Sequence, residues 1–177
     1  MPQPLHKAFL EQALRNLRSL SAFSALPNCC DWQITVCFYT SVHLLKSHLA
    51  RHNETATKHE MLKHKISDNN TVIPSPCIFP ERGRLAHRSL EQLSHESRYV
   101  FSDGGNPSID VTMPIFSDGK LLEAVRKLNT VMEEYNGLYP TDFPITKIIL
   151  AASSPSSIPY FTFEQRGAMV AAGGTPA

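Results

Sequence analysis

The densest group of side chains able to do chemistry lies between residues 46 and 65. Cations and imidazoles outnumber acids here: His48, His52, His59 and His64 stand with Lys46, Arg51, Lys58, Lys63 and Lys65, against Glu54 and Glu60. Clustered cations can hold a phosphate backbone, and a neutral imidazole can accept a proton. The pattern predicts a nucleic-acid-binding surface formed by Arg51, His52, Lys58 and His59. The alternative is a solvated helix end and loop.

A second set of Arg and His residues is spaced along the predicted helix 83–102. Arg84, Arg88, His95 and Arg98 recur at helical spacing and share one face. Arg88 and His95 are seven residues apart, so their side chains point in nearly the same direction. If the chain cleaves RNA, as the family resemblance given below implies, His95 would act as the catalytic general acid/base and Arg88 as the clamp for phosphate charge, while Arg84 and Arg98 bind neighbouring phosphates. The alternative is an exposed face whose charges pair with one another.

Other chemistries lack their motifs. His48 and His52 share a helix face, but no Cys or Asp nearby completes a metal-ligand set. The chain has no Gly-x-Ser-x-Gly nucleophile turn, no phosphate loop and no dinucleotide-binding glycine motif. Its four cysteines include no Cys-x-x-Cys pair. We therefore expect neither a metal nor a cofactor.

Composition limits the protein class. The chain has 177 residues, 42% of them hydrophobic, and a formal net charge of +1, which argues against a globally basic nucleic-acid binder. No apolar run is long enough for a membrane helix and no signal-peptide pattern opens the chain, so we expect a cytoplasmic protein without a membrane partner. Residues 1–102 carry 12 Lys or Arg against 8 acids, whereas residues 103–177 carry 5 against 8.

The spacing of hydrophobic residues predicts the helices and strands that position these side chains. We expect helices over 5–25, 30–52, 57–66, 83–102 and 119–136, and short strands over 109–111, 145–150 and 160–163. The fold class is mainly α: an up-and-down bundle of four or five helices with an irregular C-terminal section. Residues 1–102 form the helical bundle, and residues 103–177 hold one further helix and a partly irregular tail.

Three details of the helices complete the prediction. Thr57 and Glu60 have the spacing of a capping box. In the central helix, Trp32 and Tyr39 are expected in the core. His43 is expected to be buried and neutral, holding a neighbouring helix through a hydrogen bond.

Three segments carry a resemblance to a known family. They are residues 31–46 (DWQITVCFYTSVHLLK), residues 57–61 (TKHEM) and residues 93–99 (LSHESRY). They resemble HEPN proteins, the higher eukaryotes and prokaryotes nucleotide-binding family, and the likeness covers residues 5–102, about 55% of the chain. The resemblance implies an up-and-down helical bundle, commonly paired as a homodimer.

The family signature is an Arg followed, after four to six residues, by a His, with the site formed across a dimer. Two pairs here have such a spacing, Arg82 with His87 and Arg88 with His95, and geometry favours the second. The resemblance therefore implies a metal-independent RNase or an RNA- or nucleotide-binding component of a toxin or defence system. The alternative is a non-catalytic helical adaptor or complex-assembly subunit with a protein partner.

Overall fold

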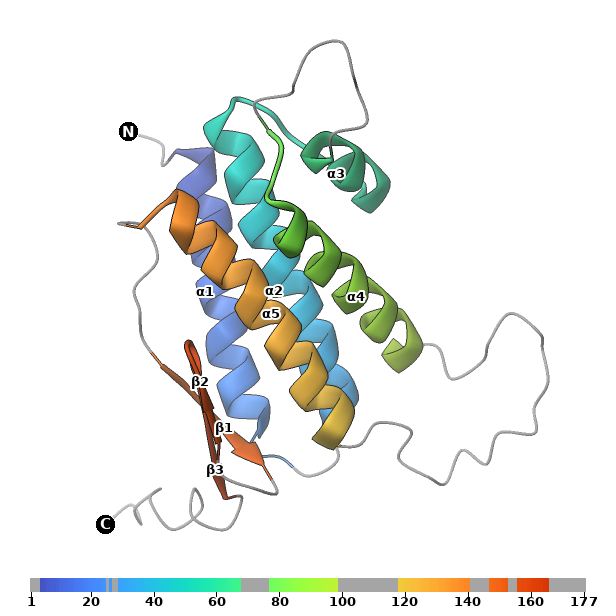
Figure 1. Cartoon of the computed structure of the whole chain (residues 1–177), viewed down its shortest axis with the longest axis vertical. Coiled ribbons are helices and arrows are strands. Elements are labelled where there is room, and N and C mark those ends of the chain that lie inside the picture. The colour runs from blue at the N-terminus through green and yellow to red at the C-terminus, as the bar shows by residue number, and fades with distance from the viewer. Residues whose placement is uncertain are drawn as a thin grey trace, which may run out of the picture.

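The protein is an up-and-down helical bundle with a small sheet beside it. The computed structural model describes residues 4–24, 26, 29–67, 77–98, 118–140, 147–152 and 156–165. In chain order these form α1 (Leu5–Ser24), α2 (Cys30–Arg51), α3 (His59–Ile66), α4 (Glu81–Arg98), α5 (Asp118–Leu138), β1 (Ile148–Ala152), β2 (Ser156–Ile158) and β3 (Phe161–Gln165). The long helices α1 and α4 run opposite to α2 and α5 (Figure 1). The predicted fold class is confirmed.

All five predicted helices are present, and each begins within two residues of its expected start. The expected capping box is wrong. The N-cap of α3 is Lys58, and its side chain makes no capping hydrogen bond. Glu60 lies in the first turn of α3, and its carboxylate pairs instead with Lys63 one turn later, at 2.6 Å. None of the described helices is both long and apolar enough to cross a membrane.

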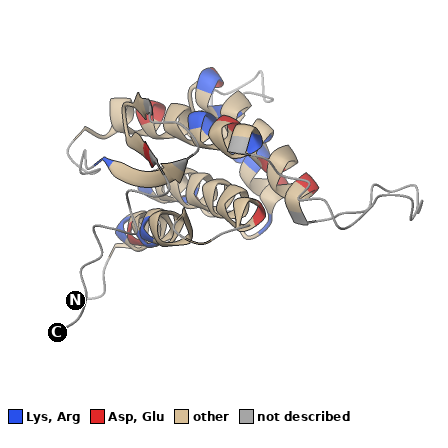
Figure 2. Ribbon diagram, turned by 90° about the horizontal axis from the view of Figure 1, so that it is seen from below, with Lys and Arg blue, Asp and Glu red and all other residues tan. Residues whose placement is uncertain are grey.

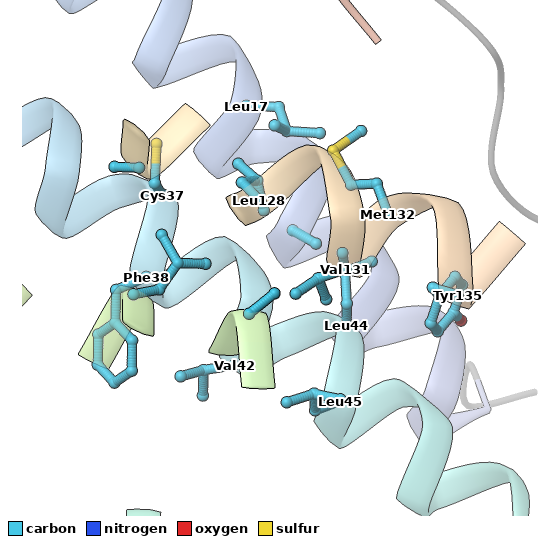
Figure 3. Packing of buried hydrophobic residues seen from close by; sticks show 14 of the residues in the cluster. Leu17, Cys37, Phe38, Val42, Leu44, Leu45, Leu128, Val131, Met132 and Tyr135 are labelled. Atoms are coloured by element: carbon cyan, nitrogen blue, oxygen red, sulfur yellow. The ribbon is translucent and has the colours of Figure 1, made fainter. Parts of the chain in front are cut away.

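α2 lies at the centre of the bundle and contacts each of the other four helices. Its core face joins one hydrophobic cluster with Leu17 of α1 and Val131 and Met132 of α5, in which Leu44 of α2 lies next to Val131 (Figure 3). Burying an apolar side chain of this size contributes about 1.5–3 kcal/mol, so this face provides much of the drive to fold.

The expectation that Trp32 is a core residue is wrong, because its side chain is 60% exposed. Trp32, Val36, Tyr39 and His43 form one stripe of α2, and none of the four is fully buried. The buried face lies on the other side of this helix. An apolar helix has two candidate core faces in the sequence, and the packing of its neighbours chooses between them.

The three strands form one sheet in the order β1-β3-β2. β1 pairs with β3 in parallel and β2 pairs with β3 antiparallel. The sheet lies against α1, where the Ser21 hydroxyl donates to the Ile149 carbonyl oxygen at 2.9 Å. Two expected strands are thus present, β2 was not predicted, and the expected strand 109–111 lies outside the described residues.

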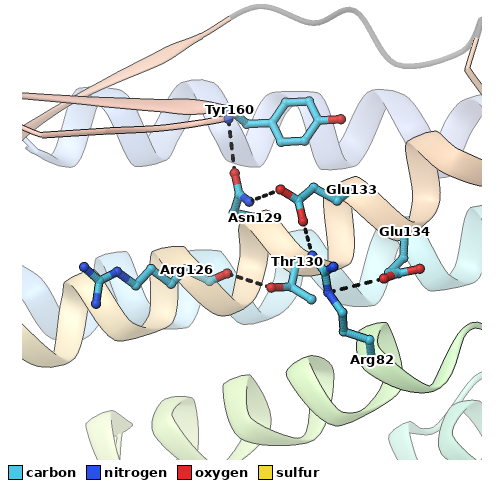
Figure 4. A network of polar contacts seen from close by, with 7 residues as sticks. All are labelled: Arg82, Arg126, Asn129, Thr130, Glu133, Glu134 and Tyr160. Atoms are coloured by element: carbon cyan, nitrogen blue, oxygen red, sulfur yellow. Dashed lines mark hydrogen bonds and ion pairs between the residues drawn. The ribbon is translucent and has the colours of Figure 1, made fainter.

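Polar contacts tie the sheet to the bundle (Figure 4). The Tyr160 backbone N–H donates to Asn129 Oδ1 at 3.1 Å, and Asn129 Nδ2 donates to Glu133 at 2.9 Å. Glu133 and Glu134 both pair with Arg82 of α4. A single hydrophobic cluster also includes residues of α2, α5 and the sheet. This cluster therefore includes residues from both sides of residue 103.

A close approach of α4 to the segment before it provides a test of this packing. A Cβ on Gly83 would lie 2.3 Å from Phe79 Cε1 and 3.3 Å from Glu134 Cβ. We expect Gly83→Ala to lower the free energy of unfolding by about 1–3 kcal/mol through overpacking. Gly137→Ala is the matched control, because nothing lies within 4 Å of its new Cβ. Urea denaturation of both variants checks this, and equal stabilities would contradict the packing described.

Candidate functional site

The main part of the candidate site is a groove between α3 and α4. Lys63, His64 and Ser67 line it from α3 and its C-cap together with Glu60, and Arg88 and Glu91 line it from α4. The groove has a volume of about 390 Å³. A narrower extension, without room for a water molecule, continues from it to Arg84 and His87.

The acids of the groove pair with Lys63. Its Nζ lies 2.6 Å from Glu60 Oε1 and 3.2 Å from Glu91 Oε2. The hydrogen bond to Glu60 raises the pKa of Lys63 and lowers the pKa of Glu60. Arg84 and Arg88 form no ion pair with any described residue. No described carboxylate therefore neutralises the two guanidiniums, and they can pair with an anionic ligand.

Charge on the whole molecule is mixed rather than gathered on one face. Lys and Arg positions stand beside Asp and Glu positions on the same helices (Figure 2). An anion would therefore meet favourable charge at a specific place, the groove, and not over a broad surface.

His87 lies at the inner end of the extension and is 1% exposed. The Ser41 hydroxyl of α2 donates to the Phe38 carbonyl oxygen at 2.7 Å, so its oxygen can only accept from the His87 ring. His87 Nδ1 lies 2.8 Å from that oxygen and therefore carries the proton. Nε2 is left with a lone pair.

The surroundings of His87 keep its ring neutral. Burial lowers the pKa of His87 to about 3, and the positive groups His59, Lys63 and Arg88 add to the effect. The ring stacks on Phe38 at 5.6 Å between centroids. Within the described part of the chain, its Nε2 is buried without a hydrogen-bond partner, as is Arg84 Nε in the same extension. A buried polar atom without a partner is costly, so both atoms are candidates for contact with a ligand.

The structure brings together only part of the predicted site. Arg88 lines both the groove and its extension, and Arg84 lines the extension. His95 is exposed further along α4 and is absent from the lining of the groove. Arg98 lies in the last turn of α4, and its side chain is outside the described residues.

The predicted surface of residues 46–65 is divided between two places. Lys58 is the exposed N-cap of α3, and the ring of His59 lies 5.3 Å from that of Phe38, near the His87 ring. Arg51 instead stacks over Tyr139 at 4.3 Å, and His52 lies against the His48 ring at 5.0 Å. Arg51 and His52 thus belong to the end of the bundle where α2 meets α5.

His48 is part of that end of the bundle. Its Nε2 donates to the Cys77 carbonyl oxygen at 3.0 Å, and its Nδ1 accepts from the Tyr139 hydroxyl at 2.8 Å. Burial lowers its pKa to about 4. A neutral ring with both nitrogens bonded ties α2 to α5 and to the segment before α4. No group of three or more His, Cys, Asp or Glu side chains in the described ranges is arranged to hold a metal ion.

One expectation about a single residue changes, and the predicted divergence of Arg82 and His87 is observed. The hydrogen bond expected from His43 is not found: its Nδ1 has no partner among described residues, and the ring packs 6.2 Å from that of Phe9. The pair Arg82 and His87 has the family spacing but shares no site, since Arg82 pairs with α5 while His87 faces α2. Five residues apart on a helix, the two side chains diverge.

Sequence reasoning missed Ser41 as a partner of His87. The available signal was a small hydroxyl residue in a helix that is apolar on most sides. A buried hydroxyl in such a helix must find a partner on a neighbouring element.

Comparisons with protein-family models, with curated proteins and with solved structures gave no match for this chain.

The buried histidines predict how stability depends on pH. The pKa values of His43 and His48 are lowered to about 4 and that of His87 to about 3, whereas an unfolded His titrates near 6.5. The unfolded chain therefore binds more protons below pH 6.5, and stability falls as pH drops from 6.5 toward 4. Each group contributes a slope of at most about 1.4 kcal/mol per pH unit.

Urea denaturation at pH 7, 6 and 5 measures this slope. His43→Gln removes one titrating ring that makes no described hydrogen bond through Nδ1, so its slope should be shallower than that of the native chain. The lowered pKa values of Glu60 and Glu96 place their titration below this window. A stability that stays constant or rises from pH 7 to 5 would show that these rings are accessible to protons.

Proposed function

We propose that the chain is a HEPN-like module that binds RNA or a nucleotide through the groove between α3 and α4. The observation that carries this proposal is that Arg88 lines the groove and Arg84 lines its narrow extension, while the two acids of the groove are engaged by Lys63. A guanidinium binds phosphate oxygens through two parallel N–H groups, which favours Arg for this role.

Binding is better supported than cleavage at this groove. An effective general acid or base has a pKa near the working pH. The pKa of His87 is about 3, so its ring is neutral at pH 7 and cannot supply a proton to a leaving group. Cleavage would have to use another imidazole, and His95 on the exposed face of α4 is the candidate that the family spacing suggests.

The alternative, an adaptor for a protein partner, rests on exposed apolar side chains. Trp32 is 60% exposed at the start of α2, and Leu85 is 53% exposed on α4. Aromatic residues are enriched where proteins bind each other. Pull-down with the native chain and with Trp32→Ala distinguishes this alternative, which requires a partner that the variant no longer binds.

The RNA-binding proposal predicts the effect of removing one guanidinium. We expect Arg88→Ala and Arg84→Ala each to weaken binding of a labelled single-stranded RNA about tenfold, because each removes a charge-assisted hydrogen bond to phosphate. The slope of log affinity against log salt should become shallower by about 0.7 for each phosphate that the variant no longer neutralises. Fluorescence anisotropy at several salt concentrations measures both.

Arg18→Ala is the matched control, since Arg18 is an exposed cation of α1 outside the groove. It should bind RNA as the native chain does. Equally weakened binding in all three variants would mean that RNA binds through overall charge, and unchanged binding in all of them would remove the groove assignment.

The finer hypothesis of cleavage has its own test. Purified protein in excess chelator would be incubated with single-stranded RNA, beside His95→Ala and His59→Ala. If His95 is the general acid/base, its removal should reduce the rate by about 10²–10⁴-fold while the helical content is unchanged. A native chain that binds RNA without degrading it would support a binding module instead.

A further inference from the structure

The hydrogen bonds of His87 determine what its ring can offer a ligand. Ser41 uses its proton on the Phe38 carbonyl oxygen, so the proton between Ser41 and His87 belongs to Nδ1. Nε2 is then an acceptor and not a donor. A neutral histidine can carry its proton on either ring nitrogen, and the Ser41 contact at Nδ1 determines which tautomer His87 adopts.

Nε2 lies close to the proposed phosphate site, where it could form a hydrogen bond with a ligand group next to the phosphate. His87 shares the narrow extension with Arg84 and Arg88, the cations that the proposed function assigns to phosphate, and with Lys63, which is paired with Glu60 and Glu91. Nε2 is buried and lacks a partner among the described residues. A ligand held by these cations would satisfy it best by presenting a hydrogen-bond donor close to the phosphate.

We propose that His87 Nε2 accepts a hydrogen bond from a hydroxyl group adjacent to the bound phosphate, so that the groove prefers ribonucleotides over deoxyribonucleotides. The inference rests on the proposed function of the groove. The ribose 2′-hydroxyl is a donor beside the 3′-phosphate, and DNA has no such group. Ser41 is a positioning residue, because it acts through the ring that it orients.

Access of a ligand to Nε2 requires movement of the side chains that line the extension. The extension has no room for water as it stands, and three of its lining side chains, those of Lys63, Arg84 and Arg88, are long and flexible. Arg88 is exposed, and Lys63 is held only by ion pairs at the surface of the groove. A phosphate that draws Arg84 and Arg88 toward itself would open the path to the ring.

Affinities of matched RNA and DNA strands test the preference. We expect the native chain to bind single-stranded RNA about two- to tenfold more tightly than DNA of the same sequence, the range of one net hydrogen bond. Ser41→Ala should bring this ratio close to one, since it leaves the Nδ1 proton without an acceptor and no longer holds Nε2 as an acceptor. His87→Phe should do the same while keeping a ring against Phe38.

Ser89→Ala is the control for Ser41→Ala. Ser89 also donates to a carbonyl oxygen of its own helix, that of Leu85, at 3.1 Å, and it does not line the extension. It should retain the native preference for RNA. A native ratio of one, or a preference that survives both Ser41→Ala and His87→Phe, would overturn the role of Nε2.

Nitrogen-15 NMR of the native chain tests the same inference without a variant that must fold. The His87 ring should carry its proton on Nδ1 at pH 7. Adenosine 3′-monophosphate should shift the Nε2 resonance, whereas its 2′-deoxy analogue should bind and leave it in place. A protonated Nε2 in the free protein, or equal shifts with both nucleotides, would overturn the proposal.

The outcomes also separate this inference from the function on which it rests. Binding of both sugars with equal affinity would keep the phosphate groove and remove the hydroxyl contact. Binding of neither RNA, DNA nor nucleotide would remove the groove as a phosphate site, and the hydroxyl contact with it.

Discussion

A central helix that is covered on most sides must place its polar groups against partners inside the protein, and the structure depends on this constraint. Ser41 of α2 bonds to His87 of α4, and Ser47 bonds to Tyr135 of α5. His48 bonds to Tyr139 and to the Cys77 carbonyl oxygen. An apolar interface alone tolerates sliding of one helix along another, whereas paired polar atoms accept only one arrangement. These hydrogen bonds therefore set the position of α4 and α5 along α2.

The candidate site is a consequence of the same constraint. One face of the His87 ring packs on Phe38 in the core, and its Nδ1 is used to join α2 and α4. The remaining nitrogen borders the polar groove that α3 forms with α4. The interior thus supplies an oriented acceptor, and the surface supplies the cations of Arg84 and Arg88. Under the proposed function both features serve recognition, because a ring with a pKa of about 3 is neutral at pH 7 and has no acidic proton to donate to a leaving group.

One of the two pairs with the Arg-to-His spacing of the HEPN family, Arg82 and His87, is divided between different contacts. Arg82 pairs with Glu133 and Glu134, and Glu133 also bonds to Asn129, which receives the backbone N–H of Tyr160. This arginine therefore helps to join α4, α5 and the sheet. A motif defined by spacing identifies residue types at a distance along the chain, and the neighbours of each helix decide whether the two side chains meet.

By itself the sequence determined the number, order and approximate starts of the helices, because hydrophobic spacing is a local property of each segment. It also placed Arg84 and Arg88 on a shared face of α4. It could not choose which apolar face of α2 is buried, and so Trp32 was expected inside. Only the tertiary structure decided that Lys63 completes the groove and that Ser41 orients His87. Those partners lie far apart along the chain, 46 positions in the case of Ser41 and His87, and no local pattern specifies such a contact.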